Sequence, residues 1–103
     1  MDRKVDWSPE AVEDLESIAD YISRDSEFYA SSVITKVLEL ARTIGKFPLL
    51  GRTVPELDDE AIRERFVFSY RLIYHIAQER ILIIAVIHGK RLLESISERF
   101  SQS

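Results

Sequence analysis

In the first half of the chain, apolar residues recur with the spacing of amphipathic helices. One apolar stripe follows Ser8-Pro9, a helix start with Ser at the N-cap and Pro at the first helical position, and runs to about Ser23. A longer stripe ends at Gly45, with Pro48 three residues further on. We therefore expect a hairpin of two helices with one wide apolar face. Its apolar positions are Ala11, Leu15, Ile18 and Ile22 in the first helix and Ala30, Val33, Ile34, Val37, Leu38, Ala41 and Ile44 in the second.

In the second half, the pattern changes to that of strands. Residues 62–68 alternate imperfectly, residues 70–77 form a second run, and residues 81–87 are apolar throughout, as expected for a central strand covered on both faces. The polar interruption at residues 78–80 predicts a hairpin between the last two runs. The alternation of the first run places Arg63, Arg65 and Val67 on one side and Ile62, Glu64, Phe66 and Phe68 on the other.

The remaining segments complete a small α+β fold. Lys4 to Trp7 is extended in character, and residues 47–59 contain two prolines and a glycine, which predicts a loop with neither helix nor regular strand. The expected order is β-α-α-β-β-β(-α), with the helical hairpin packed on one face of a small antiparallel sheet. At 103 residues the chain fits a single domain, residues 1–103. The short C-terminal helix rests on the spacing of Leu92, Leu93, Ile96 and Phe100.

Composition narrows the functional classes. The chain has no cysteine, so thiolate metal sites and disulfides are excluded, and no apolar run approaches the ~20 residues of a membrane span. The start of the chain lacks the apolar core of a signal peptide, so we expect a soluble cytoplasmic protein that does not bind a membrane. The net charge of -4 opposes broad affinity for nucleic acid. Acidic residues on the outer face of the first helix are expected to be solvated: Glu10, Glu13, Asp14, Glu16 and Asp20.

Candidate chemistry is confined to the strands. His75 is expected to be a packed or surface residue, whereas His88 ends a strand beside two cations and is either a surface residue or a proton donor. No second His or Cys lies near either one, so neither a metal site nor a cofactor is expected. Arg71 should project from the sheet opposite to its two neighbours, either as a surface arginine or as part of an anion-binding patch. The patch would be shared with Arg63, Arg65 or Arg91.

The order of elements and a set of short motifs resemble the ParE/RelE family of bacterial toxins from type II toxin–antitoxin systems. The resemblance covers nearly the whole chain. It implies an antitoxin whose extended or helical segment lies in an apolar and basic groove of the toxin, giving a hetero-oligomer. The matching pieces are Trp7 to Ala11, Leu15 with Ile18 to Ile22, Phe47 to Arg52, Val54 to Leu57, Tyr70 to Tyr74, and Val86 to Arg91. The residues implied in partner binding are Arg63, Arg65, Tyr70, Arg71, Tyr74, Lys90 and Arg91.

Two activities occur among proteins of this resemblance: RelE-like members cut messenger RNA on the ribosome, and ParE-like members poison DNA gyrase. Arg71 and Arg91 match arginines that RelE-like nucleases use against the scissile phosphate, and Arg63 and Arg65 fall where those enzymes carry lysines. The tail position of the RelE catalytic tyrosine is Ser97 here. A nuclease would therefore have to use Arg71, Arg91 and His88, with Glu60 or Glu64 as general base.

The loop motifs at residues 48–52 and 54–57 and the long helical hairpin are closer to ParE. We therefore expect a toxin that inhibits DNA gyrase without catalysing a reaction and that a cognate antitoxin neutralises. The alternatives are a ribosome-dependent endonuclease, with ribosome and messenger RNA as partners, and a member that has lost toxicity and only binds antitoxin.

Overall fold

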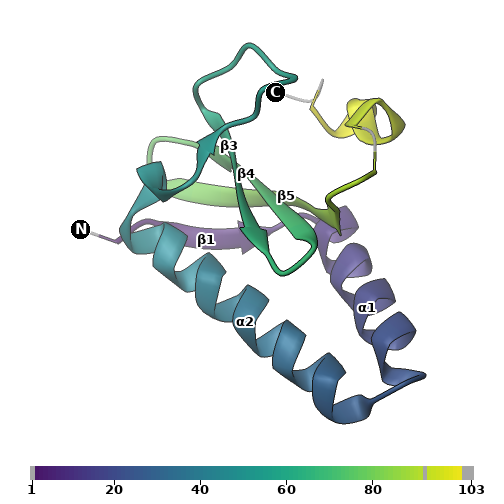
Figure 1. The fold of residues 1–103 in the computed structure, drawn as a ribbon. Coiled ribbons are helices and arrows are strands. Elements are labelled where there is room, and N and C mark those ends of the chain that lie inside the picture. The colour runs from purple at the N-terminus through teal and green to yellow at the C-terminus, as the bar shows by residue number, and fades with distance from the viewer. Residues whose placement is uncertain (1, 92, 101–103) are drawn as a thin grey trace.

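A computed structural model describes residues 2–91 and 93–100. It confirms the α+β class and the expected order of elements (Figure 1). Of the expected tail positions, Leu92 lies outside the described residues. The elements are β1 (Lys4–Trp7), α1 (Pro9–Ser23), α2 (Glu27–Lys46), the 3-10 helix η1 (Pro48–Leu50), β2 (Arg52–Thr53), β3 (Ile62–Val67), β4 (Tyr70–Ile76), β5 (Arg80–His88) and the 3-10 segment η2 (Leu93–Arg99).

The five strands form one sheet in the order β1-β5-β4-β3-β2. The pairs from β2 to β5 are antiparallel, as predicted, whereas β1 pairs with β5 in parallel, Lys4 beside Arg80 and Trp7 beside Ile83. The chain reaches β5 from β1 only after the helical hairpin and three further strands. This long connection permits the parallel pairing of β1 with β5. The sheet is therefore mostly antiparallel, with one parallel edge.

The helices begin at side-chain caps. The Ser8 hydroxyl accepts a hydrogen bond from the Ala11 amide at 3.1 Å, and the Ser26 hydroxyl accepts one from the Tyr29 amide at 3.1 Å. The predicted end of the second helix at Gly45 is wrong by one residue, because α2 continues to Lys46. Gly45 serves close packing instead: a Cβ atom there would lie 2.8 Å from Val5 Cγ2 on β1.

The prediction that residues 47–59 contain neither helix nor strand is wrong. Pro48 opens η1, and Arg52 and Thr53 form the short edge strand β2, which pairs with β3. The Tyr74 hydroxyl of β4 holds this segment in place, because it donates a hydrogen bond to the Pro48 carbonyl at 2.6 Å and accepts one from the Gly51 amide at 2.9 Å. These are tertiary contacts, which local turn residues do not reveal.

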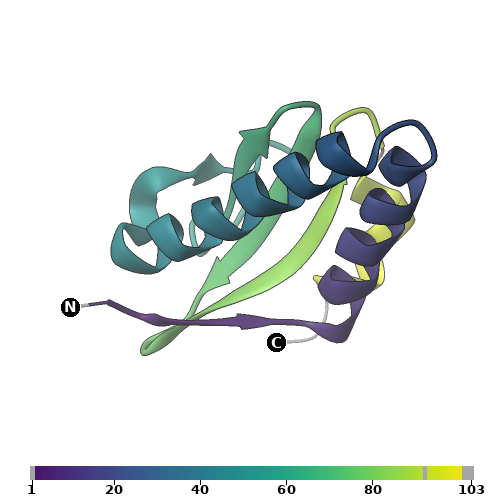
Figure 2. The same ribbon diagram turned by 90° about the horizontal axis from the view of Figure 1, so that it is seen from below.

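The sheet lies between two apolar layers. The helical hairpin covers one face, which Figure 2 shows from below, and η2 lies over the other (Figure 1). Leu93 and Ile96 of η2 are buried against Ile73, Ala85 and Ile87. The inner strand β5, between β1 and β4, is thus buried on both faces, as its continuous apolar run predicted. In residues 2–91 and 93–100, no helix is both long and apolar enough to span a bilayer.

Candidate functional site

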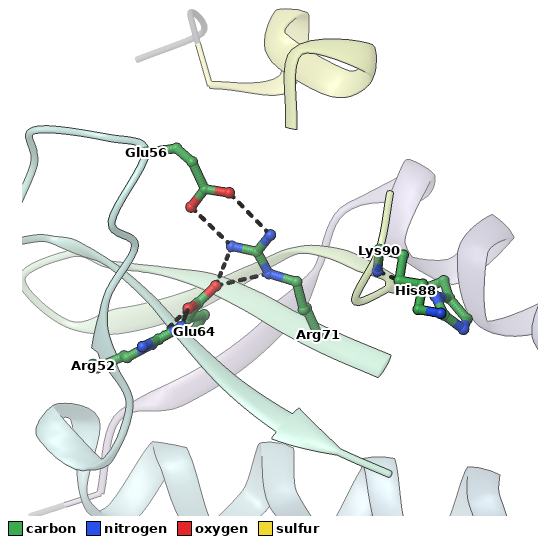
Figure 3. A network of polar contacts seen from close by, with 6 residues as sticks. All are labelled: Arg52, Glu56, Glu64, Arg71, His88 and Lys90. Carbon is green, nitrogen blue, oxygen red and sulfur yellow. Dashed lines mark hydrogen bonds and ion pairs between the residues drawn. The ribbon is translucent and has the colours of Figure 1, made fainter. Parts of the chain in front are cut away.

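Arg71 is the centre of a charged network on the face of the sheet that η2 covers (Figure 3). Its side chain is 6% exposed. The Nε and Nη2 atoms donate to Glu64 Oε1, Nε at 2.8 Å. Nη1 and Nη2 donate to the two carboxylate oxygens of Glu56, each at 3.2 Å. Arg71 therefore donates twice to one oxygen of Glu64 and forms a bidentate contact with both oxygens of Glu56, a geometry that guanidinium groups favour.

Glu64 is the most deeply buried member of the network, with no side-chain exposure. Its second carboxylate oxygen accepts a hydrogen bond from Arg52 Nε at 2.7 Å and forms an ion pair with Arg52 Nη2 at 2.7 Å. The four residues come from β2, the loop after it, β3 and β4, so the network ties the edge segment to the sheet. Their formal charges cancel, which leaves no net cation at Arg71.

The register of β3 and β4 explains which side chains meet. Arg71 pairs with Phe66, and the Arg71 guanidinium lies 6.0 Å from the centre of the Phe66 ring. Because side chains alternate along a strand, Glu64 and Phe66 share the η2 face with Arg71. Arg63 pairs with Tyr74, which packs in the helix-side core, so it points to the opposite face. This alternation of β3 was predicted from the sequence, and so was the direction of Arg71.

The arginines considered for one anion-binding patch are therefore divided. Arg63 Nη1 donates to the Gly51 carbonyl at 2.9 Å, and Arg65 Nη1 donates to the Leu50 carbonyl at 3.2 Å. Both hold the same segment that Tyr74 holds. Arg91 lies beyond the end of β5, where its Nε donates to the Ser95 hydroxyl at 2.9 Å. The structure brings none of these three guanidinium groups into contact with Arg71.

Two other predicted residues, Tyr70 and His88, lie where β4 begins and β5 ends. Tyr70 and His88 form a cross-strand pair with their rings 5.9 Å apart, and the His88 Nδ1 atom accepts from the Lys90 amide at 3.1 Å. Since Tyr70 packs in the helix-side core, His88 lies on the face of the sheet opposite to Arg71, and Figure 3 shows the two apart. His75 is half-buried on β4. The structure does not unite Arg71 and His88 in one site.

Two adjoining grooves beside Tyr70 and His88 were not predicted. Their volumes are about 390 and 290 Å³, and both are lined by Tyr21, Tyr70 and His88. Burial is the main cause that raises the pKa of Tyr70, followed by the nearby Tyr21 and Tyr29. Phe68 adds its ring to this end, in a turn where its φ of 54° is unusual for a bulky residue. Alternation alone does not reveal such a turn.

Sequence reasoning also missed three charged residues. Arg52 and Glu56 were read as parts of a loop motif, yet both enter the Arg71 network. Asp14 was predicted to be solvated, which is wrong: it accepts from the Val86 amide at 3.0 Å and from Arg99 at 2.7 and 3.1 Å. The Asp14 contact is the main cause that raises the pKa of Arg99. One feature of the sequence could have revealed the charged network. Glu64 is an acidic residue on the inward side of a strand, and a buried carboxylate requires a cationic partner.

The Glu56 contact gives a testable dependence of stability on pH. The hydrogen bond from Arg71 is the main cause that lowers the pKa of Glu56 from its ordinary 4.5. A lowered pKa stabilises the fold above pH 4.5, and the contribution is lost as pH falls through the folded-state value. We expect Glu56→Gln to lower the free energy of unfolding by less than about 1 kcal/mol at pH 7, since the carboxylate is half-exposed.

Urea denaturation of the wild type and Glu56→Gln from pH 7 to pH 3 measures this difference. The difference in the free energy of unfolding should shrink as the pH falls below 4.5. A difference that grows with acidification would contradict the assignment.

Within the described part of the chain, no group of three or more His, Asp or Glu side chains is arranged to hold a metal ion. The arrangement at Arg71 is thus one of paired charges. An oxyanion would find no unpaired cation at Arg71. Among the residues described, no histidine lies close enough to Arg71 to take part in a reaction there.

Comparisons with known proteins agree with this fold. The family model described as ParE toxin of type II toxin–antitoxin system, parDE, matches residues 5–93. No curated protein matches in sequence. Similar solved structures include the chromosomal ParDE system of P. aeruginosa, with a TM-score of 0.71, 15% identity, and coverage of 85% of this chain and 97% of that chain.

Two further structures are the RelBE2 toxin–antitoxin complex of Mycobacterium tuberculosis and a mutant of E. coli toxin RelE in the free state. The first has a TM-score of 0.63 and 21% identity, and the match covers 85% of this chain and 99% of that chain. The second has a TM-score of 0.65 and 16% identity, and covers 99% and 94%. At these identities the structures establish the shared fold.

Proposed function

The chain belongs to the ParE toxin family of type II toxin–antitoxin systems, and from this premise we propose that it stops growth by inhibiting DNA gyrase. A cognate antitoxin neutralises it by forming a hetero-oligomer. A target that acts on chromosomal DNA places the toxin in the cytoplasm. The proposal gives the toxin a binding role and assigns it no catalytic residue.

The observation that carries the proposal is the paired state of Arg71. A nuclease needs a cation free to meet the scissile phosphate and an acid or base within hydrogen-bond reach of the reacting atoms. Here Glu56 and Glu64 occupy the Arg71 guanidinium, and His88 lies on the other face of the sheet. The tail position of the RelE tyrosine holds Ser97, which lacks a ring to stack on a base. These features support inhibition by binding over cleavage of messenger RNA.

The predicted partner-binding residues take two roles in this proposal. Tyr70, Lys90 and Arg91 lie at the end of the sheet and contact a partner directly. Arg63, Arg65 and Tyr74 act indirectly, because their contacts hold the segment between α2 and β3 in place. Arg71 also holds this segment, through Glu56, and meets a partner directly once that contact opens.

The supercoiling of a plasmid, in cells that are induced to express the toxin without its antitoxin, tests the proposal. We expect its negative supercoiling to fall soon after induction, before protein synthesis declines, because gyrase is the enzyme that restores it. Co-expression of the antitoxin encoded beside the toxin should prevent the change. Chloroquine gels of plasmid topoisomers, taken over the first minutes, measure the effect.

Three outcomes would contradict it. Growth arrest with unchanged plasmid supercoiling would exclude gyrase. New transcript ends inside translated messages would identify an endonuclease. Unchanged growth would identify a member that has lost toxicity and only binds antitoxin.

A further inference from the structure

The two carboxylates on Arg71 differ in how firmly they are held. Glu64 is completely buried and is bound from both sides by Arg52 and Arg71, so it cannot leave without exposing the centre of the network. Glu56 is 50% exposed on a loop and has Arg71 as its side-chain partner. Arg71 thus has one fixed carboxylate, that of Glu64, and one, that of Glu56, which a side-chain rotation alone is enough to remove.

We propose that Glu56 holds the place of an acidic side chain of the antitoxin, which displaces Glu56 and binds Arg71 when the complex forms. This inference rests on the proposed function for the existence of the antitoxin, and it adds the exchange at Arg71. Glu56 is then an internal competitor that weakens the complex.

Charge favours a carboxylate as the incoming group. Without Glu56, the remaining side chains Arg52, Glu64 and Arg71 carry one net positive charge, which a single carboxylate neutralises. The Nη1 and Nη2 atoms of Arg71 already present the parallel pair of donors that a carboxylate accepts. A nucleic acid is the weaker fit, since its many phosphates would meet a chain with a net charge of -4.

The space beside Glu56 indicates what flanks that carboxylate. A groove of about 430 Å³ opens there between the loop after β2 and η2. Its lining is mostly apolar and includes Leu57, Leu93 and Phe100. An antitoxin segment with an acidic residue next to apolar ones would place the carboxylate on Arg71 and the apolar side chains in this groove.

The exchange is energetically feasible. A half-exposed ion pair contributes little, so releasing Glu56 to water costs little. The incoming pair is covered by the partner, and charge pairs strengthen when water is excluded. Removal of Glu56 should therefore strengthen antitoxin binding, the opposite of what loss of a contact residue does.

Titration calorimetry with the antitoxin encoded beside the toxin tests whether removal of Glu56 raises or lowers the binding affinity. We expect Glu56→Ala to bind the antitoxin roughly 3- to 10-fold more tightly than the wild type does. The antitoxin no longer has to displace an exposed ion pair from Arg71 in this variant. Glu60→Ala, which removes an exposed carboxylate from the same loop, is the matched control and should leave the affinity unchanged. Equal or weaker binding of Glu56→Ala would overturn the inference while leaving the proposed function standing.

A second measurement does not need the antitoxin. Glu56→Ala leaves the place on Arg71 open, so acetate at constant ionic strength should raise the melting temperature of this variant more than that of the wild type or Glu60→Ala. Chloride and inorganic phosphate serve as comparison anions. The same response to acetate in all three proteins would overturn the inference. If the wild type binds no antitoxin, the partner assignment of the proposed function fails, and this inference fails with it.

Discussion

Replacing Glu64 by alanine should destabilise the fold by about 3 to 5 kcal/mol, the range for removing one partner of a buried ion pair. The substitution takes away the carboxylate that binds two arginines. Arg52 is largely exposed and can turn to water, but Arg71 is 6% exposed and keeps only the half-exposed Glu56. A buried guanidinium with unpaired donors is the main source of the loss.

Urea denaturation at pH 7 measures the effect, with Glu56→Gln as the matched control from the exposed side of the same network. The control should stay within about 1 kcal/mol of the wild type. If Glu64→Ala also stays within that range, the network does not stabilise the sheet, and the role given to the Arg71 contacts is wrong.

Much of the fold follows from periodicity. The apolar stripe of each helix was predicted, and so were the Ser8 cap of α1 and the ends of both helices, within one or two residues. The Ser26 cap of α2 was not predicted. The continuous apolar run of β5 predicted a strand covered on both faces. The segment between α2 and β3 was missed for a physical reason. Its two-residue strand and its 3-10 turn depend on Tyr74 and the arginines of β3, which are distant in sequence.

The candidate site was predictable only in part. Alternation placed Glu64 and Arg71 correctly, each opposite in direction to its neighbours. The sequence does not give the register between β3 and β4, and this register decides that Arg71 meets Glu64 and is separated from Arg63 and Arg65. Grouping arginines by residue type alone therefore assembled a patch that the two faces of the sheet divide.

Purified toxin at saturating concentration should abolish negative supercoiling by gyrase. The reason is the combination of a ParE-family fold with an arginine network that leaves no free cation at Arg71, while His88 lies on the opposite face of the sheet. In the function we propose, the toxin acts by occupying gyrase, so inhibition should saturate with the toxin-to-gyrase ratio. Added antitoxin should reverse it in proportion to the complex formed.

Inhibition of gyrase and cleavage of messenger RNA are distinguished most directly by two assays on one preparation of toxin. The first is gyrase supercoiling of relaxed plasmid, and the second is cell-free translation with mapping of transcript ends. We expect that supercoiling is blocked, that antitoxin restores it, and that translated messages stay intact. Normal supercoiling at saturating toxin, with messages cut in the translation reaction, would contradict this expectation.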